Sequence, residues 1–253
     1  MLTEERRRTI LEELNRTGRV LVTELAARCK ASQVTIRKDL DALYQKGLVH
    51  RTHGGALPAR EGVFEDPSLR EKEKLYREEK LRIAAAAVQR VKEGQVVILD
   101  SGTTTTGIAR KLREFRRLTV VTNAVNIAGE LVGTGIEVIL TGGTLRNNSF
   151  SLVGPMAEES LRHLNADILF LGVDGIDVRH GLSTPNLLEA TVNRAMVQAA
   201  KHTVATCDSS KFGRRSLAHI VPLGAIQEVI TDKGAPNSDV KALRKAGVIV
   251  TLV

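Results

Sequence analysis

Short aliphatic runs alternate with helical stretches from residue 95 to the end of the sequence, and this alternation restricts the fold more than any other feature. The aliphatic runs predict strands at 96–99, 119–122, 137–140, 168–172, 203–206, 228–231 and 248–252. Helical patterns near 104–114, 124–132, 155–164, 186–201 and 238–246 lie between or beside them. The alternation predicts an α/β domain with a mostly parallel sheet and helices on both faces.

Polar and glycine-rich segments follow several of these expected strands. Ligands of such sheets bind at the carboxyl ends of the strands, so these segments are where a site is expected. Glycines let backbone amides approach a ligand, and the helix that starts near residue 104 offers its positive end to an anion. The segments are DSGTTTT (100–106), 122–123, TGGTLRNNSFSLVGP (141–155), GVDGIDVRHGLST (172–184) and CDSSKFG (207–213).

A phosphorylated polyol fits this combination of residues best. Arg146 and Lys211 supply cations for a phosphate, and carboxylates supply acceptors for sugar hydroxyls. The candidate effector-binding residues are Asp100, Ser101, Gly102, Thr103, Thr104, Thr105, Asn123, Gly142, Gly143, Arg146, Asp174, Gly175, Glu189 and Lys211.

A nucleotide fits poorly. Gly102 and Gly107 have the spacing of a P-loop, but Ile108 and Ala109 stand where Lys and Ser or Thr are required. The GxGxxG pattern of dinucleotide-binding folds is absent too, so no nucleotide cofactor is expected.

The first sixty residues have the pattern of a helix-turn-helix. A helix is expected from Thr3 to a stop at Gly18, then a short helix at 24–29 capped by Thr23, and a second at 33–45 capped by Ser32. The segment LVHRTHGGA (48–56) predicts a two-stranded wing. An ordinary three-helix bundle with solvated charges is the alternative.

The start of the helix at 33–45 is polar and basic, as in helices that enter the major groove. Gln can read adenine, Arg can read guanine, and Thr can contact a thymine methyl group. The candidate DNA-binding residues are Ser32, Gln33, Thr35, Arg37, Lys38, Arg51 and His53.

The charge distribution agrees with a nucleic-acid partner at one end. Residues 1–60 hold 12 Lys and Arg against 7 Asp and Glu, whereas the rest of the chain is closer to balance. The N-terminus is charged, and no apolar run reaches the ~18 residues that span a bilayer, so a cytoplasmic protein without a membrane partner is expected. Cys29 and Cys207 lack CxxC or CxxH neighbours, which argues against a zinc site.

We therefore divide the chain into a DNA-binding domain at 1–57, a linker at 58–74 and an effector-sensing domain at 75–253. The segment LREKEKLYREEKLRIAAAAVQRVKEG (69–94) contains strong helix formers throughout and predicts one helix that ends at Gly94. Its first half is highly charged and is expected to be exposed, while its alanine-rich second half is expected to pack on the sensing domain.

The segment SQVTIRKDLDALYQKGLVHRTHGGA (32–56) resembles the winged helix of the DeoR family of bacterial transcriptional regulators. The motifs ILDSGTTT, VVTNA, LTGGTLR, SLVGP, LFLGVDGID, GLST, EATVNRAM and DSSKFG resemble the effector-binding domain of the same family. The resemblance implies that 33–38 reads DNA, and that the larger domain is similar in fold to ribose-5-phosphate isomerase and the CoA transferases. It also implies a role in sensing a phosphorylated sugar.

Two functions from different classes remain. The first is a regulator, expected to be a repressor of sugar-catabolism genes that acts as a homo-oligomer, either a dimer or a tetramer, on operator DNA. The second is a phosphosugar isomerase or transferase with a basic appendage, in which Asp174 or Asp177 would act in proton transfer. The segment VRHGLSTPN lacks the lysine of the isomerase loop, so the regulator is favoured and no catalytic residue is assigned.

Overall fold

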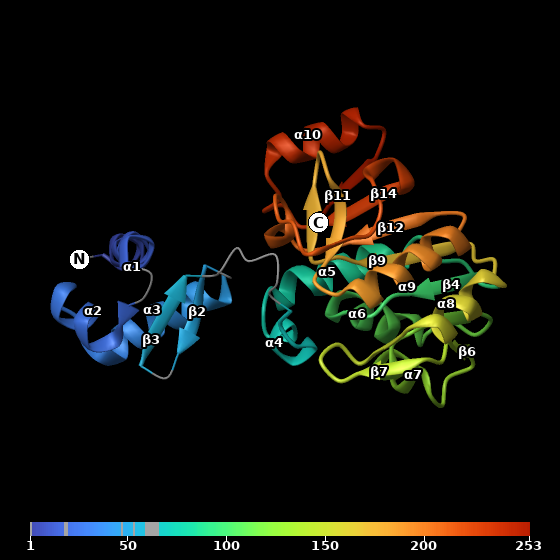
Figure 1. Ribbon diagram of the computed structural model, residues 1–253, viewed down its shortest axis with the longest axis horizontal. Coiled ribbons are helices and arrows are strands. Elements are labelled where there is room, and N and C mark those ends of the chain that lie inside the picture. Colours follow the sequence, from blue (N-terminus) through green and yellow to red (C-terminus); the bar gives the residue numbers. More distant parts are fainter. Residues whose placement is uncertain (1, 18–19, 47, 53, 59–65) are drawn as a thin grey trace. The chain divides into compact units, whose positions relative to one another are not determined.

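The computed structural model describes residues 2–17, 20–46, 48–52, 54–58 and 66–253 (Figure 1). The chain divides into two compact units, which are described separately. The first is Met1–Gly62 with Lys74–Tyr76, and the second is Val63–Glu73 with Arg77–Val253.

The N-terminal unit is a winged helix-turn-helix, as predicted. Its helices pack around a small core that includes Ile10, Leu25, Ile36 and Leu40, all buried. The wing is an antiparallel hairpin, and a short strand that the sequence analysis missed pairs with it on the other side. The elements are α1 Thr3–Thr17, β1 Val20–Leu21, α2 Val22–Arg28, α3 Gln33–Gln45, β2 Val49–Thr52 and β3 Gly55–Pro58.

The two caps expected in this unit have different outcomes. Ser32 caps α3, and its hydroxyl accepts a hydrogen bond of 3.1 Å from the amide of Thr35. The prediction that Thr23 caps α2 was wrong, because α2 begins directly after β1 at Val22. The amide of Val22 donates to the carbonyl of Gly54 at 2.8 Å, so the turn of the wing satisfies one of the amides that the first turn of a helix leaves without an acceptor.

The second unit is built on a seven-stranded sheet in which every neighbouring pair is parallel. This confirms the predicted α/β class. The strands, in their order across the sheet, are β15 Ile249–Leu252, β14 Glu228–Thr231, β12 Thr203–Thr206, β9 Ile168–Gly172, β4 Val96–Leu99, β5 Thr119–Thr122 and β6 Glu137–Leu140.

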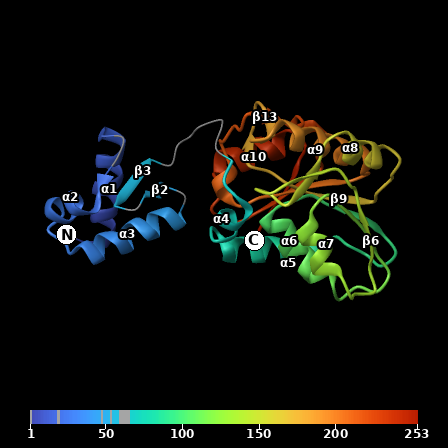
Figure 2. The ribbon, with the colours of Figure 1, turned by 60° about the horizontal axis from the view of Figure 1, so that its bottom comes forward.

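Helices cover both faces of the sheet, and alternate strand residues fill the two layers beneath them (Figure 2). Val97 and Leu99 pack with one set of helices, whereas Ile98 packs with the other. The first set is α5 Arg77–Val88, α6 Thr103–Leu112 and α7 Val125–Leu131, and the second is α8 Pro155–Arg162, α9 Leu187–Ala199 and α10 Asn237–Lys245.

Small sheets and 3₁₀ turns add to this frame where the sequence analysis expected only loops. The segments 141–155 and 172–184 each form a hairpin, and the second hairpin gains a third strand from a later part of the chain. These elements are β7 Thr144–Arg146, β8 Ser151–Val153, β10 Gly175–Asp177, β11 Gly181–Thr184, β13 Ala218–His219, and the turns η1 Ser209–Lys211 and η2 Leu223–Ala225.

The prediction of one continuous helix over 69–94 was wrong. A short helix, α4 Leu69–Glu73, ends before Tyr76, which has φ of +52°, and α5 begins at Arg77. A left-handed residue stops the α-helical hydrogen-bond pattern, so the chain restarts in a new direction. The expectation that the charged half is exposed was also wrong at Lys72 and Lys80, whose side chains turn inward towards carboxylates.

Candidate functional site

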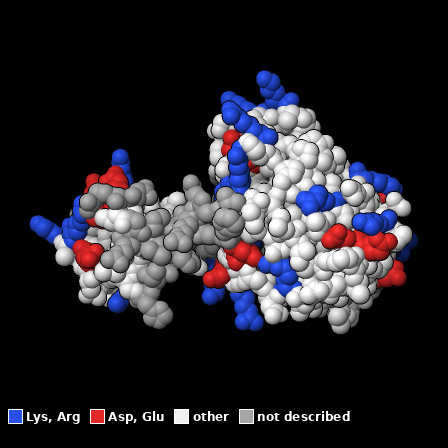
Figure 3. All heavy atoms as spheres, viewed as in Figure 1, with Lys and Arg blue, Asp and Glu red and all other residues white. Residues whose placement is uncertain are grey.

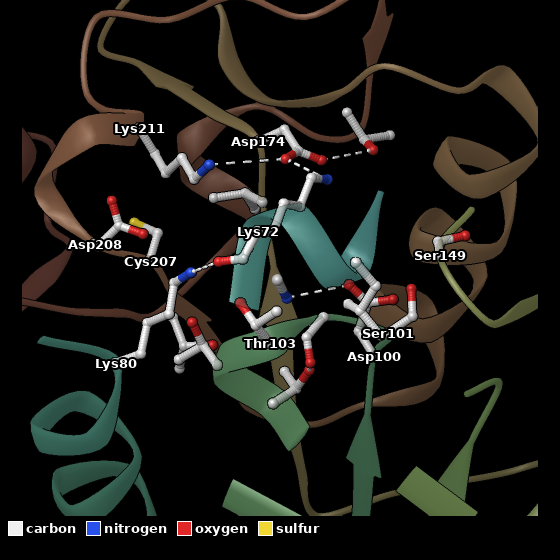
Figure 4. Close-up of a pocket in the computed structure, with 18 of the residues that line it drawn as sticks. Lys72, Lys80, Asp100, Ser101, Thr103, Ser149, Asp174, Cys207, Asp208 and Lys211 are labelled. Carbon is white, nitrogen blue, oxygen red and sulfur yellow. Dashed lines mark hydrogen bonds and ion pairs between the residues drawn. The ribbon is translucent and has the colours of Figure 1, made fainter. Parts of the chain in front are cut away.

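A cavity lies at the carboxyl ends of the three central strands β4, β9 and β12 (Figure 4). Adjacent parallel strands deliver the residues that follow them to one place, so Asp100, Asp174 and Asp208 come together although they are far apart in sequence. The cavity is lined by Leu69, Lys72, Lys80, Asp100, Ser101, Gly102, Thr103, Thr104, Thr105, Ser149, Gly172, Val173, Asp174, Thr184, Glu189, Asn193, Thr206, Cys207, Asp208 and Lys211.

The first turn of α6 forms one wall of the cavity. Gly102 precedes the helix with φ of +154°, a backbone conformation that residues with a side chain rarely adopt, and the hydroxyls of Thr105 and Thr106 donate to its carbonyl at 2.9 and 2.6 Å. An α-helix leaves its first backbone N–H groups without intrahelical acceptors, and its positive end favours negative charge. This wall can therefore hold an anion such as a phosphate.

Three lysines bring positive charge to the same cavity: Lys72, Lys80 and Lys211. Lys72 Nζ lies 2.7 Å from Asp174 Oδ1, and Lys211 Nζ lies 3.9 Å from the same atom. Burial favours the neutral form of Asp174, but the charges of Lys72 and Lys211 outweigh it and hold its pKa at about 2. Asp174 is thus a carboxylate that its lysine partners keep ionised.

Lys80 is buried, and its ammonium donates to the main-chain carbonyl of Lys72 at 2.5 Å. Burial lowers its pKa to about 8; the Asp208 carboxylate acts in the opposite direction, whereas the Lys211 and Lys72 charges add to the decrease. An incoming anion would stabilise the charged form of Lys80 and relieve its repulsion from the other two lysines.

Asp100 differs in character from Asp174. It is fully enclosed, and one of its carboxylate oxygens accepts a hydrogen bond of 3.1 Å from the amide of Gly172. Burial, together with the negative charge of Glu189, raises the pKa of Asp100 to about 8. Asp100 is thus the carboxyl group of the cavity whose surroundings favour the protonated form, which can donate a hydrogen bond.

Nine of the fourteen predicted effector residues line the cavity, and five do not. Gly143 and Gly175 are needed for close packing: a Cβ on Gly143 would lie 2.6 Å from the carbonyl oxygen of Val153, and one on Gly175 would lie 2.5 Å from that of Arg214. Gly142 has φ of +73°, a conformation that favours glycine. The five are Asn123, Gly142, Gly143, Arg146 and Gly175.

The other two of these five have their own interactions behind the cavity. Arg146 forms ion pairs of 2.5 Å with both Glu189 and Asp66. Asn123 is buried on β5's carboxyl end, where its side-chain amide donates to the carbonyl of Leu152 at 3.2 Å. Arg146 thus acts on the cavity through Glu189, whose carboxylate it neutralises.

Sequence analysis missed Lys72, Lys80 and Asn193 as cavity residues. The two lysines lie in a charge-rich helical segment where a lysine is normally solvated, and the intervening break in the helix is not visible in the pattern. The one available signal was Lys80 itself, a lysine that directly precedes the alanine-rich packing face of α5. Among the described residues, no group of three or more His, Cys, Asp and Glu side chains is placed to hold a metal ion.

The N-terminal unit presents its predicted DNA-binding residues on one exposed face of α3. Gln33, Arg37 and Lys38 are exposed and Thr35 is half-buried, while Ile36 and Leu40 face the core. Figure 3, which shows one side of the molecule, has several Lys and Arg side chains projecting from this unit.

The remaining predicted DNA contacts lie in or beside the wing. Arg51 is in β2, opposite Ala56 of β3, and His53 lies outside the described residues. The helix is held in place from behind, because the buried carboxylate of Asp39 pairs with Arg6 and, at 3.0 Å, with Arg7 of α1.

Both units match known protein domains. Residues 6–61 match the DeoR-like helix-turn-helix domain, and residues 76–233 match the DeoR C-terminal sensor domain. The chain belongs to the DeoR family. This DeoR-family chain is a DNA-binding transcriptional regulator, as its sequence predicted. No helix in the described ranges has the length and apolar character needed to cross a membrane.

Its DeoR-family relatives are similar over almost their whole length. The chain is 43% identical to a putative aga operon transcriptional repressor of Escherichia coli O157:H7 over 99% of this chain and 94% of that protein. It is 41% identical to the HTH-type transcriptional regulator GlpR of Haloferax volcanii, over 99% of this chain and 98% of that one.

Solved structures are similar only in part. A ribose 5-phosphate isomerase from Methanocaldococcus jannaschii matches 53% of this chain and 53% of its own, with 21% identity and a TM-score of 0.40. An eIF2B β subunit from Chaetomium thermophilum matches 63% of this chain and 49% of its own, with 14% identity and a TM-score of 0.41.

Proposed function

We propose that this chain represses genes of carbohydrate catabolism, and that a phosphorylated sugar bound in the cavity changes its affinity for operator DNA. Residues 1–57 bind DNA and residues 75–253 sense the effector. Residues 58–74 connect them and add Leu69 and Lys72 to the lining of the cavity. The relative named as an aga operon transcriptional repressor supports the direction of regulation. A homo-oligomer acts on the operator, because two linked recognition helices bind paired half-sites far more tightly than one does.

The observation that carries this proposal is the composition of the cavity. It combines the positive end of α6 with Lys80 and Lys211, which together suit a group of two negative charges. Around this anion site lie acceptors and donors suited to hydroxyl and carbonyl groups, including the protonated Asp100 and the amide of Asn193. In a phosphorylated polyol, the phosphate would occupy the anion site and the hydroxyl groups would bind the surrounding donors and acceptors.

The chain senses the sugar and does not convert it. An aldose–ketose isomerase needs a carboxylate base that is available to take a proton from carbon. Glu189 is engaged by Arg146 at 2.5 Å and by the hydroxyl of Ser151 at 2.8 Å, and Asp174 is paired with Lys72. Asp177 lies on the hairpin β10–β11, bonded to His180, and does not line the cavity. Each of these carboxylates is committed to a partner.

The test begins with a thermal-shift screen of the full chain against a library of sugar phosphates and the matching free sugars. We expect sugar phosphates, and not free sugars, to raise the unfolding temperature. Lys211→Ala should weaken the best ligand by roughly tenfold, the loss expected for one charge-assisted contact. The matched control is Lys201→Ala, which removes an exposed lysine paired with Asp167 outside the cavity.

Each ligand found is then added to a gel shift with DNA that the full chain has selected from a random library. The ligand should change the DNA affinity, and Arg37→Ala should lower DNA affinity by about 1–3 kcal/mol without changing ligand affinity. Turnover of a pentose phosphate that Asp174→Asn abolishes would instead favour an isomerase. A DNA affinity that does not respond to Arg37 would remove α3 as the reading helix.

A further inference from the structure

The outer face of α3 carries an aliphatic side chain, that of Val34. Val34 is 59% exposed, whereas Ile36 and Leu40 of the same helix are fully buried in the core of the N-terminal unit. All of α3 lies in the described part of the chain, and the other exposed residues of this helix are polar or charged. The exposed residues of α3 are Gln33, Val34, Arg37, Lys38, Asp41 and Gln45.

Valine is an unfavourable residue for this position if only folding matters. A β-branched side chain loses rotamer freedom in a helix, so valine is a weaker helix former than alanine or leucine. Burial of the side chain normally offsets this loss, but more than half of Val34 stays in contact with solvent. A contact that forms only in the complex with DNA would offset it instead.

The neighbours of Val34 are side chains suited to reading DNA. Gln33 precedes it, and Arg37 and Lys38 follow three and four residues later, which places them beside Val34 on the helix surface. In a helix-turn-helix, the first turns of the second helix reach base edges in the major groove. Val34 lies in the first turn of α3, so it would face a base pair among these polar contacts.

The base feature that suits an aliphatic side chain in the major groove is the 5-methyl group of thymine, because the other features of the base edges there are hydrogen-bond donors and acceptors. On sequence grounds Thr35 is the candidate for this contact. Thr35 is half-buried, however, and its hydroxyl lies 2.9 Å from that of Ser32. Its amide donates to the same Ser32 oxygen at 3.1 Å, so Thr35 belongs to the cap of α3.

We propose that Val34 is a specificity-determining residue that recognises the methyl group of a thymine in the operator. Its side chain has essentially one rotamer in a helix, so its methyl groups are in position before DNA binds. The proposal rests on the proposed function, because it requires α3 to be the reading helix. It adds a residue that contacts a base without hydrogen bonds, and it names the base.

The experiment uses the full chain and the half-site that it selects from a random DNA library. Each thymine of the half-site is replaced in turn by deoxyuridine, which forms the same base pair and lacks only the 5-methyl group. Fluorescence anisotropy gives the dissociation constant at one fixed salt concentration, because DNA affinity depends steeply on salt. At one position, the replacement should weaken binding of the unchanged chain about fourfold, the effect of one methyl group removed from water.

Three variants show whether Val34 is the partner of that methyl group. In Val34→Ala the effect of deoxyuridine should fall below about twofold, because most of the aliphatic side chain is gone. Val34→Ile keeps a branched aliphatic side chain and should keep the fourfold effect. Leu48→Ala is the matched control: Leu48 is 45% exposed and lies just beyond the other end of α3, so the fourfold effect should remain.

Thermal unfolding separates a lost contact from a lost fold. Alanine is the better helix former at an exposed position, so Val34→Ala should unfold at the same temperature as the unchanged chain or above it. Two results would overturn the role of Val34: deoxyuridine weakens binding equally in Val34→Ala and the unchanged chain, or it has no effect at any thymine of the half-site. The proposed function survives both results if Arg37→Ala still lowers the affinity for the same DNA. If Arg37→Ala binds that DNA as tightly as the unchanged chain does, α3 is not the reading helix and both proposals fail at this step.

Discussion

Two turns of the same sheet, one after β4 and one after β6, look alike in sequence and do different work in the structure. Each follows an aliphatic strand and contains glycine and threonine: DSGTTTT in the first and TGGTLR in the second. The first turn opens on the cavity and starts α6 there. The second turn packs its glycines under α8 and leads into β7, away from the cavity.

The difference arises from strand order. β4 lies beside β9 in the centre of the sheet, so its end meets the ends of β9 and β12. β6 is at the edge, two strands further on, and its turn has only β5 beside it. Glycine at a strand end therefore has two distinct uses, and the neighbours of the strand decide which use applies.

The largest expected effect is a loss of stability when a glycine is replaced in the edge turn, the turn TGGTLR (141–146) after β6. Gly143→Ala places a Cβ 2.6 Å from the carbonyl oxygen of Val153 in a backbone with φ of +113°, and we expect unfolding free energy to fall by about 3 kcal/mol. Gly102→Ala has backbone strain as well, with φ of +154°, but its Cβ meets only the hydroxyl of Thr105, at 3.3 Å, so it should cost less, about 1–2 kcal/mol, while weakening phosphate binding in the cavity. Urea unfolding measures the stability of both variants, and phosphate titration measures their phosphate affinity. The distinction between the two turns is wrong if Gly143→Ala is as stable as the unchanged chain, or if it lowers phosphate affinity more than Gly102→Ala does.

The next effect concerns Lys80, a cation in the cavity that the central turn, DSGTTTT (100–106) after β4, also lines. Lys80→Met should weaken phosphate by roughly tenfold, because a buried ammonium in the cavity is replaced by an apolar chain of similar length. The variant should be as stable as the unchanged chain or more so, since the cost of burying a charge is removed. Calorimetry and thermal unfolding measure the two quantities, with Lys201→Met as the control. If Lys80→Met still binds phosphate tightly, Lys80 does not contact the anion that the turn after β4 is expected to hold.

A third expected effect is a pH dependence that the turn after β4 should show, through Asp100, and the turn after β6 should not. The pKa of Asp100 is about 8 in the folded chain and near 4 when unfolded, so the folded state holds an extra proton between those values. Stability contributed by this group is therefore complete at low pH and is lost as pH rises towards 8. This loss begins above about pH 4, where the unfolded carboxyl ionises, so Asp100→Asn should match the unchanged chain at or below about pH 4 and become the more stable of the two as pH rises towards 8.

Thermal unfolding of both proteins across that range checks this expectation. Lys80, whose pKa is also about 8, is present in both proteins, so the difference between the two curves reports Asp100. Parallel curves for the two proteins would mean that Asp100 is already ionised at neutral pH. Thr141, at the end of β6, carries no ionisable group, so the edge turn makes no comparable contribution.

The sequence predicted those parts of the molecule that depend on local pattern. The strands, the α/β class, the helix-turn-helix and the Ser32 cap each follow from residues close together in the chain. Strand order does not, because it depends on how segments such as β4 and β9 pair over 70 residues of separation. Without that order, Gly142 and Asp100 could not be ranked as cavity residues.

The two missed lysines illustrate the same limit. Lys72 and Lys80 lie in a segment whose composition is that of a solvated helix, and only the break near Tyr76 brings them inward. The left-handed backbone of Tyr76 is set by packing and is not visible in a helical propensity. A charged helical segment before a sheet domain can thus supply residues that line a cavity as well as a connection.

The ion pairs behind α3 have a consequence for the evolution of such proteins. Asp39 anchors the helix to Arg6 and Arg7, whereas Gln33, Arg37 and Lys38 project from its outer surface. The residues that anchor the helix are therefore different from the residues that would contact the bases. Operator preference can therefore drift by substitution on one surface while the mounting stays intact, and a new target gene can be acquired without rebuilding the fold.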